Sequence, residues 1–359
     1  MSWPFCSQKC TYCNFASGVL PKALEPEYAA ALVRELRQHA WSDAPDTVYL
    51  GGGTPSLMPL DLMRAVLEAV PGAPWAEATI EAAPGSLAPE RVEAWREAGI
   101  TRVSLGVQSL VTREAARTGR RHTAETVSED VAMLRDAGID DFNIDLIAGL
   151  PGQTEASWEE SLDWLERLDA PHVSVYMLEV DEDSRLGQEV LLNGQRYGAP
   201  DVPADEIVVR LYERATERLR RMGLYRYEIS NFARPGFESK HNLKYWQLES
   251  YFGFGADAHS CDGGRRWQNV EAVPEYVSRM RDFGSARAAE TSANAGEERF
   301  YVGLRLARGI SDDGPATAAQ RDAIERFVSE GLLARQNGML RLTERGILLS
   351  NEVFAELVA

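Results

Sequence analysis

The segment Cys6–Cys13 reads CSQKCTYC and places three cysteines in a Cys-x3-Cys-x2-Cys pattern. Three thiolates can each bind one iron of a [4Fe–4S] cluster and leave the fourth iron open to an outside ligand. The alternative is a zinc site whose fourth ligand is His39 or His241. Zinc sites usually pair cysteines in two separated Cys-x2-Cys units, and no second unit follows here, so the pattern favours a cluster. The remaining cysteine, Cys261, stands alone and is expected to be an ordinary small residue.

From residue 25 to about 220, strand-like apolar segments alternate with amphipathic helical segments. A strand that returns roughly every 30 residues through a helix is typical of βαβ units and predicts a parallel sheet, either open or closed into a barrel. The expected strands are Thr47–Leu50, Ala78–Glu81, Arg102–Val107, Phe142–Ile147 and His172–Leu178, and the expected helices include Pro26–Ala40, Pro89–Ala98, Ala124–Ala137 and Ser157–Leu168.

Ligand-binding residue types follow several of these strands. The stretch Gly51–Pro55 reads GGGTP, and its glycines let the backbone approach a ligand without interference from a Cβ atom. Glu81, Gln108 and Asp145 each lie at or near the carboxyl end of a different expected strand, which is where ligands bind in parallel α/β folds. One such residue would more often be a loop-facing polar group, but three together, beside the cysteine motif, predict a cofactor site.

The rest of the chain has a different pattern. Leu224–Ile229 is an expected strand, and the glycine-rich, aromatic stretch after it is expected to be a functional loop. Two expected helices, Glu298–Leu306 and Ala318–Glu330, are followed by the expected hairpin Leu332–Leu342, which turns at Asn337-Gly338. We therefore divide the chain into residues 1–222, a connecting region 223–295, and a winged-helix-like region 296–359.

Charge and hydrophobicity limit the partners. The formal net charge is −17, which disfavours binding to nucleic-acid phosphates or anionic lipid, so we expect no nucleic-acid partner. No apolar stretch is long enough to cross a bilayer, and no secretory signal is visible. We expect a cytoplasmic protein without a transmembrane segment. A DNA-binding role for the winged-helix-like end is the hypothesis that the sequence supports least.

The sequence around the cysteines, Trp3–Cys6 and Cys10–Phe15 with Tyr12 inside, resembles the radical S-adenosylmethionine superfamily. It is similar to the branch that contains oxygen-independent coproporphyrinogen III oxidase and related heme chaperones. The resemblance covers nearly the whole chain and implies an α/β fold, a partial (β/α)6 TIM-like barrel with a small C-terminal winged-helix-like α+β domain. In that family the reduced cluster cleaves adenosylmethionine into methionine and a 5′-deoxyadenosyl radical. The family's first strand is expected upstream of Ser2, so the barrel is expected to lack it.

The resemblance also assigns residues to cofactors. A second stretch, Tyr227–Gly236 followed by His241–Trp246, matches the chaperone branch, whose His-Asn-x-x-Tyr-Trp motif is associated with heme; residue types alone would favour a packed aromatic loop. The implied [4Fe–4S] ligands are Cys6, Cys10 and Cys13; the implied S-adenosylmethionine residues are Tyr12, Gly52, Gly53, Thr54, Glu81, Gln108, Arg120 and Asp145; the implied heme residues are His241, Tyr245 and Trp246.

One departure separates two functions. The decarboxylating oxidase carries a further cysteine two residues after the third, where this chain has Phe15. The difference favours a heme chaperone without oxidase activity, and the oxidase is the alternative. For a chaperone, the resemblance implies heme-acceptor proteins associated with the membrane, a peripheral location there, and a flavodoxin-like reductant.

Overall fold

The computed structural model describes residues 1–358. Its main element is an eight-stranded sheet with the strand order β1-β2-β3-β4-β5-β6-β8-β7. The first six strands are parallel and follow chain order, and β8 and β7 close the far edge in antiparallel pairing. The strands are β1 (Ser2–Trp3), β2 (Thr47–Gly52), β3 (Glu77–Ala82), β4 (Arg102–Gln108), β5 (Asp141–Ala148), β6 (His172–Met177), β7 (Tyr225–Arg226) and β8 (Asn231–Ala233).

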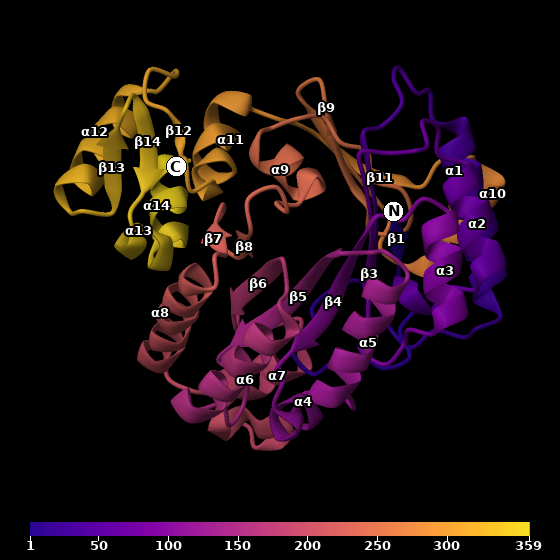
Figure 1. The fold of residues 1–359 in the computed structure, drawn as a ribbon. Helices are drawn as coiled ribbons and strands as arrows, with labels where there is room; N and C mark the ends of the chain where they lie inside the picture. Colours follow the sequence, from indigo (N-terminus) through magenta and orange to yellow (C-terminus); the bar gives the residue numbers. More distant parts are fainter. Residues whose placement is uncertain (359) are drawn as a thin grey trace.

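Helices connect the parallel strands and surround the outside of the sheet (Figure 1). Along β4, Val103, Leu105 and Val107 belong to the hydrophobic core, whereas the alternating Ser104 and Gln108 line a polar cavity. One face of the sheet is therefore apolar, and the other carries the polar side chains that line the cavity. The connecting helices are α1 (Leu24–Gln38), η1 (Pro55–Leu57), α2 (Leu60–Glu68), α3 (Pro89–Glu97), α4 (Thr112–Arg117), α5 (Ala124–Asp136), α6 (Glu155–Leu168), α7 (Arg185–Leu191), η2 (Arg196–Asp201) and α8 (Asp205–Arg221).

The predicted partial barrel is confirmed, and the five predicted strands and four predicted helices up to residue 178 match β2–β6, α1, α3, α5 and α6. The first strand, expected to be missing, is present but only two residues long. Ser2 and Trp3 form a short β1, because they pair in parallel with Gly51 and Gly52 at the end of β2.

The region 223–295 is more regular than the expected loop. The expected strand Leu224–Ile229 is only β7, because the chain turns back at Glu228, whose carboxylate accepts hydrogen bonds from the Ser230 N–H and the Asn231 side chain. A second sheet then packs beside α1, with the order β11-β10-β9. The elements are α9 (Lys240–Trp246), β9 (His259–Asp262), β10 (Arg265–Asn269), α10 (Val273–Asp282) and β11 (Arg287–Ser292).

The C-terminal unit is a small α+β layer beside β7 and α8 (Figure 1). The predicted hairpin is confirmed, and Asn337 and Gly338 both have positive φ, as a two-residue hairpin turn requires. The expected helix Glu298–Leu306 is instead split by a change from α to 3-10 geometry. Within residues 1–358, no helix is long and apolar enough to cross a membrane. The elements are α11 (Ala295–Tyr301), η3 (Gly303–Arg305), β12 (Ile310–Ser311), α12 (Ala318–Ser329), β13 (Leu333–Gln336), β14 (Met339–Leu342), α13 (Glu344–Leu348) and α14 (Ser350–Leu357).

Candidate functional site

A cavity of about 450 Å³ lies where the cysteine segment meets the carboxyl ends of β2–β5, and we call it the cofactor cavity. Every residue predicted for the cluster and for adenosylmethionine lines it, although these residues span the chain from position 6 to position 145. They are Cys6, Cys10, Tyr12, Cys13, Gly52, Gly53, Thr54, Glu81, Gln108, Arg120 and Asp145.

The cysteine segment is held by backbone hydrogen bonds to distant parts of the chain. The Cys6 N–H donates to the Gly18 carbonyl at 2.9 Å and closes the loop on itself. In the middle of the loop, the Thr11 N–H donates to the Thr118 carbonyl at 3.1 Å, and the Thr11 carbonyl accepts from the Leu186 N–H at 2.8 Å. The thiols are thus positioned by α4 and α7 as well as by β1.

The zinc alternative is not supported by this arrangement. Neither His39 nor His241 lines the cofactor cavity. In the part of the chain that the structure describes, no three His, Cys, Asp or Glu side chains are arranged to bind a single metal ion. A [4Fe–4S] cluster has a different requirement, because each thiolate binds a different iron. Cys261 lies in β9, away from the other three cysteines.

The glycines after β2 bring the cysteine loop close to the sheet. A Cβ atom on Gly53 would be 2.7 Å from the Phe5 carbonyl oxygen and 2.9 Å from Cys6 Sγ, so only glycine fits. Gly52 has φ +115°, a conformation that residues with a side chain rarely adopt. The Thr54 N–H then donates to the Phe5 carbonyl at 2.9 Å.

Two carboxylates, from β3 and β5, line the cofactor cavity. Glu81 accepts from the Tyr49 hydroxyl at 2.8 Å and from the Gly52 N–H at 3.0 Å. Asp145 accepts from the Asn143 side-chain amide at 2.7 Å. Burial raises the pKa of Glu81 to about 7 and also raises the pKa of Asp145. A cationic ligand in the cavity would favour the ionised form of both groups.

A buried amide and a buried guanidinium complete the cavity. Gln108 has φ +72°, and its Oε1 is buried without a hydrogen-bond partner in residues 1–358. Arg120 donates from Nε to the Tyr12 hydroxyl at 3.1 Å and from Nη1 to the Gly106 carbonyl at 2.5 Å. An unpaired buried acceptor costs free energy until a ligand donates to it. The cavity therefore suits a ligand with N–H or O–H donors, a positive centre and a carboxylate, and adenosylmethionine has all three.

The predicted heme residues are not in this cavity. His241 lies on α9, near Thr47 at the amino end of β2, whereas the cofactor cavity begins at Gly52, about 17 Å further along that strand. Both ring nitrogens are occupied: Nδ1 is 2.8 Å from Thr47 Oγ1, and Nε2 is 2.9 Å from the Tyr245 hydroxyl oxygen. The ring also stacks on Tyr49, and burial lowers its pKa to about 3. The imidazole is neutral and cannot coordinate iron without releasing one of these partners.

Trp246, at the end of α9, faces another part of the molecule. The Arg305 guanidinium lies 4.5 Å from the centroid of its ring. The motif thus connects the amino end of the sheet, through His241, with η3 of the C-terminal region, through Trp246.

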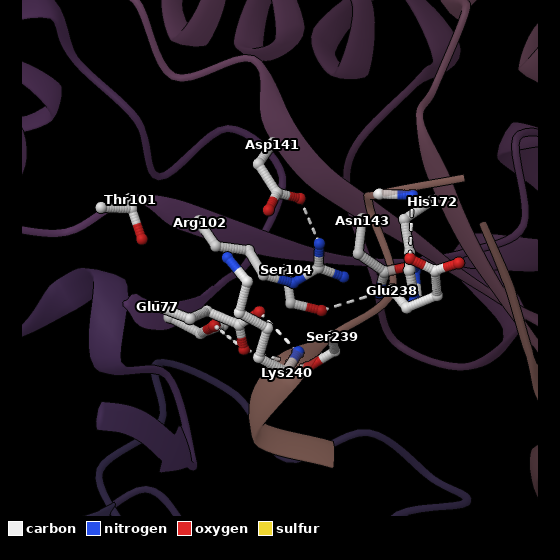
Figure 2. Close-up of polar contacts among 12 residues, drawn as sticks. Glu77, Thr101, Arg102, Ser104, Asp141, Asn143, His172, Glu238, Ser239 and Lys240 are labelled. Carbon is white, nitrogen blue, oxygen red and sulfur yellow. Dashed lines mark hydrogen bonds and ion pairs between the residues drawn. The ribbon is translucent and has the colours of Figure 1, made fainter. Parts of the chain in front are cut away.

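Sequence reasoning missed a carboxylate that holds α9. Glu77, at the start of β3, accepts hydrogen bonds from the Lys240 N–H at 2.7 Å, the His241 N–H at 3.0 Å and the Ser239 hydroxyl at 3.1 Å (Figure 2). A carboxylate beside the first N–H groups of a helix satisfies donors that have no partner within the helix. No short motif signals this contact, because Glu77 and Ser239 are far apart in the chain.

Polar side chains on β5 and β6 join the two ends of the sheet. Asn143 donates to Asp145, and its Oδ1 is 2.7 Å from Nδ1 of His172, which lies beside it in Figure 2. His172 Nε2 is 2.9 Å from the Tyr227 hydroxyl, which in turn accepts from the Ser239 N–H at 3.3 Å. Burial lowers the pKa of His172 well below its usual range, so the ring is neutral. Alternate polar residues, as in Asn143-x-Asp145, were the available sequence signal for this polar face.

Comparison with known proteins agrees with the geometry. Residues 2–165 match the Radical SAM superfamily, and residues 291–349 match the HemN C-terminal domain. The structure is similar to that of coproporphyrinogen III oxidase (HemN) from Escherichia coli, a radical SAM enzyme, with a TM-score of 0.86 over 100% of this chain and 89% of that one. Sequence identity to that enzyme is 19%, so this similarity concerns the fold alone.

Relatives of higher identity cover nearly the full length. The chain is 34% identical to the heme chaperone HemW of Bacillus subtilis, over 98% of this chain and 96% of that protein. It is 35% identical to HemW of Mycobacterium tuberculosis H37Rv, over 99% and 93%. It is 36% identical to the mitochondrial radical S-adenosyl methionine domain-containing protein 1 of Bos taurus, over 99% and 84%. The chain therefore belongs to the radical SAM superfamily and, within it, to the HemW family.

Proposed function

We propose that this protein binds heme and delivers it to acceptor proteins, and that it holds a [4Fe–4S] cluster and S-adenosylmethionine in the cofactor cavity. The observation that carries the proposal is the chain-long identity to proteins named heme chaperone HemW. The side chain at position 15 supports it: Phe15 is 67% exposed on the lining of the cavity, where the resembled oxidase carries a cysteine.

In this proposal Cys6, Cys10 and Cys13 bind the cluster. Bound there and reduced, such a cluster would supply the electron for cleavage of adenosylmethionine. The protein's contribution is orientation: Glu81 and Asp145 are acceptors for the donor groups of the ligand, and the free Gln108 Oε1 is a further acceptor. The remaining proposed contacts to adenosylmethionine are Tyr12, Gly52, Gly53, Thr54 and Arg120.

Heme binding is proposed on α9, with His241 as the iron ligand and with Tyr245 and Trp246 as flat contacts. The hydrogen bond between His241 Nε2 and Tyr245 means that this site is closed in the structure described here. Heme would have to exchange that bond for an iron–nitrogen bond.

The decisive experiment is a pair of assays on anaerobically reconstituted protein. We expect hemin to produce a saturable change in visible absorption, and coproporphyrinogen III incubated with adenosylmethionine and a reductant to remain unchanged. Iron and sulfide analysis of the same sample checks the cluster. Failure to bind hemin would refute the chaperone proposal.

The second candidate is the radical oxidase, which converts two propionates of coproporphyrinogen III to vinyl groups. It is favoured by one observation, the complete set of predicted cofactor residues around the cavity. Decarboxylated product in the same incubation would establish the oxidase and exclude a chaperone without enzymatic activity.

A further inference from the structure

A second cavity, of about 420 Å³, lies between the edge of the main sheet and the C-terminal unit, and we call it the arginine cavity. The end of α8, the hairpin β7–β8 and η3 form one side, and β13, β14 and α13 form the other. Its volume is in the range of small-molecule sites. None of the residues predicted from the sequence for a cofactor lines it.

Four arginines line this cavity, together with a single carboxylate, Glu344. The chain as a whole carries a net charge of −17, so this is a local concentration of positive charge in an acidic protein. A concave site lined by one sign of charge attracts ligands of the opposite sign. The arginines are Arg220, Arg226, Arg305 and Arg341.

Two of these guanidinium groups have buried N–H groups without partners. Arg226 has a side chain that is 11% exposed, and only its Nη2 is paired, with Glu344 Oε1 at 2.6 Å. Its Nε and Nη1 are buried and make no hydrogen bond within residues 1–358, although the Tyr212 hydroxyl lies close to this guanidinium. Arg305 pairs through Nη2 with the buried Glu228 at 3.5 Å, and its Nε is buried without an acceptor. Buried guanidinium donors left unpaired are costly. Acceptor oxygens from a ligand would remove that cost.

The other two arginines are exposed at the cavity. Arg220 and Arg341 are in no ion pair or side-chain hydrogen bond in the described chain. Arginine pairs with carboxylate and phosphate in a two-pronged geometry, so Arg220 and Arg341, with the unpaired donors of Arg226 and Arg305, can accommodate either kind of group.

The place of the cavity in the fold decides between those two chemistries. Its apolar lining residues, among them Leu224, Phe232 and Leu304, are buried core side chains and offer a ligand little surface. The cavity therefore holds the charged edge of a ligand rather than its body, and the motif proposed for heme lies next to it, on α9.

We infer that the arginine cavity binds the propionate edge of a porphyrin, an inference that rests on the proposed heme-binding function. Arg305 relates this cavity to the heme motif, because the same guanidinium lines the cavity and lies over the ring of Trp246 on α9. The site recognises the carboxylates of the porphyrin, so it does not depend on the metal.

The experiment measures binding of metal-free protoporphyrin IX to the full chain by porphyrin fluorescence. The variants Arg220→Glu and Arg341→Glu reverse exposed charges and leave the buried Arg226 pair intact. We expect each to weaken protoporphyrin binding about tenfold. Arg113→Glu is the matched control: it makes the same charge change at an exposed, unpaired arginine on α4, away from the C-terminal unit (Figure 1), and should change affinity less than about twofold.

Two further ligands separate the possible outcomes. Protoporphyrin dimethyl ester lacks the carboxylates, so its binding should be the same in all variants, and sensitivity to the reversals would overturn the inference. Pyrophosphate tests the phosphate chemistry: binding that is lost in both variants while protoporphyrin binding persists would also overturn it. If wild-type protein binds hemin and protoporphyrin and the variants bind protoporphyrin equally well, only the arginine cavity is refuted. If wild-type protein binds neither porphyrin, the proposed function itself fails.

Discussion

Glu81 illustrates how individual residues of the cofactor cavity depend on a ligand. It is a carboxylic acid held at the end of β3 by Tyr49 and Gly52, close enough to Asp145 for the two charges to repel each other. Burial is the main cause of its raised pKa, and Asp145 adds to it. A positively charged ligand in the cavity would therefore stabilise the ionised form of Glu81.

The first prediction concerns the stability of the cofactor-free protein. Because the folded-state pKa of Glu81 is about 7 and its ordinary value is 4.5, the folded state binds the proton more tightly than the unfolded state. This contribution to the free energy of unfolding is complete below pH 4.5 and is lost as pH rises through 7. We expect Glu81→Gln to be more stable than wild type at pH 8 by up to about 2 kcal/mol, since water in the cavity reduces the full effect. Urea unfolding at pH 5 and pH 8 measures it.

The outcome depends on comparing the two proteins at each pH, because Asp145 also has a raised pKa and titrates in both. A stability difference between wild type and Glu81→Gln that is the same at pH 5 and pH 8 would contradict the assignment.

The second prediction distinguishes the three proposed cluster cysteines from Cys261. Cys13→Ala should abolish the visible absorption of the reconstituted cluster, because three thiolates are needed to hold it. The half-buried side chain is small, so the cofactor-free protein should lose less than about 1 kcal/mol of unfolding free energy. Cys261→Ala is the control and should keep full iron and sulfide content. Equal cluster content in both variants would refute the ligand assignment.

Among the elements, α9 is the one whose structure is most dependent on its surroundings. It has seven residues, which is too short to be stable alone, and it is fixed by Ser239 at its start, by Glu77 below its first turn and by the two hydrogen bonds of His241. A ligand that recruits His241 therefore competes with bonds that hold the helix.

The third prediction tests that competition. Tyr245→Phe keeps the aromatic ring but frees Nε2 of His241, so we expect hemin affinity to be maintained or increased by up to about tenfold. His241→Ala removes the proposed ligand and should weaken hemin binding while leaving cluster absorption intact. Hemin titrations followed by visible absorption check both. If both variants bind hemin like wild type, His241 is not the ligand.

The sequence predicted the elements that have strong periodicity and the residues that carry short motifs. The alternating helices and strands up to residue 178 were recognisable. The residues that the resemblance assigned to the cluster and to adenosylmethionine all line one cavity. The region 223–295 was misread, because glycines and aromatics there form hairpins and close packing, which composition does not distinguish from a loop. The closed state of His241 was equally hidden, because Thr47 and Glu77 approach α9 only through the fold.

For the whole molecule, the main sheet separates two sites and connects them. The cofactor cavity lies at the carboxyl ends of the strands and α9 at the amino ends, while Asn143, His172 and Tyr227 make a continuous hydrogen-bonded path between them. Buried paths of this kind respond to a change at either end, because a buried group that loses its partner has no water to replace it.

The fourth prediction follows from this path. Adenosylmethionine bound beside Asp145 should slow hydrogen exchange at the amides of α9, which hydrogen-exchange mass spectrometry can measure. Tyr227→Phe removes the hydroxyl that joins His172 to the Ser239 N–H, far from the cavity. In that variant adenosylmethionine affinity should be unchanged and the protection of α9 should be reduced, because only the contact of Tyr49 with Glu81 and His241 still joins the cavity to the helix. Equal protection in both proteins would show that the path carries no coupling.

The contacts of Thr11 have a consequence for biosynthesis. The cysteine segment is synthesised well before Thr118 and Leu186, yet its backbone is positioned by both. At translation rates of about 5–20 residues per second, the thiols wait roughly ten seconds or more before those partners exist. We therefore expect iron loading to follow synthesis of the barrel, so that three early thiols have to stay reduced until the rest of the sheet has been made.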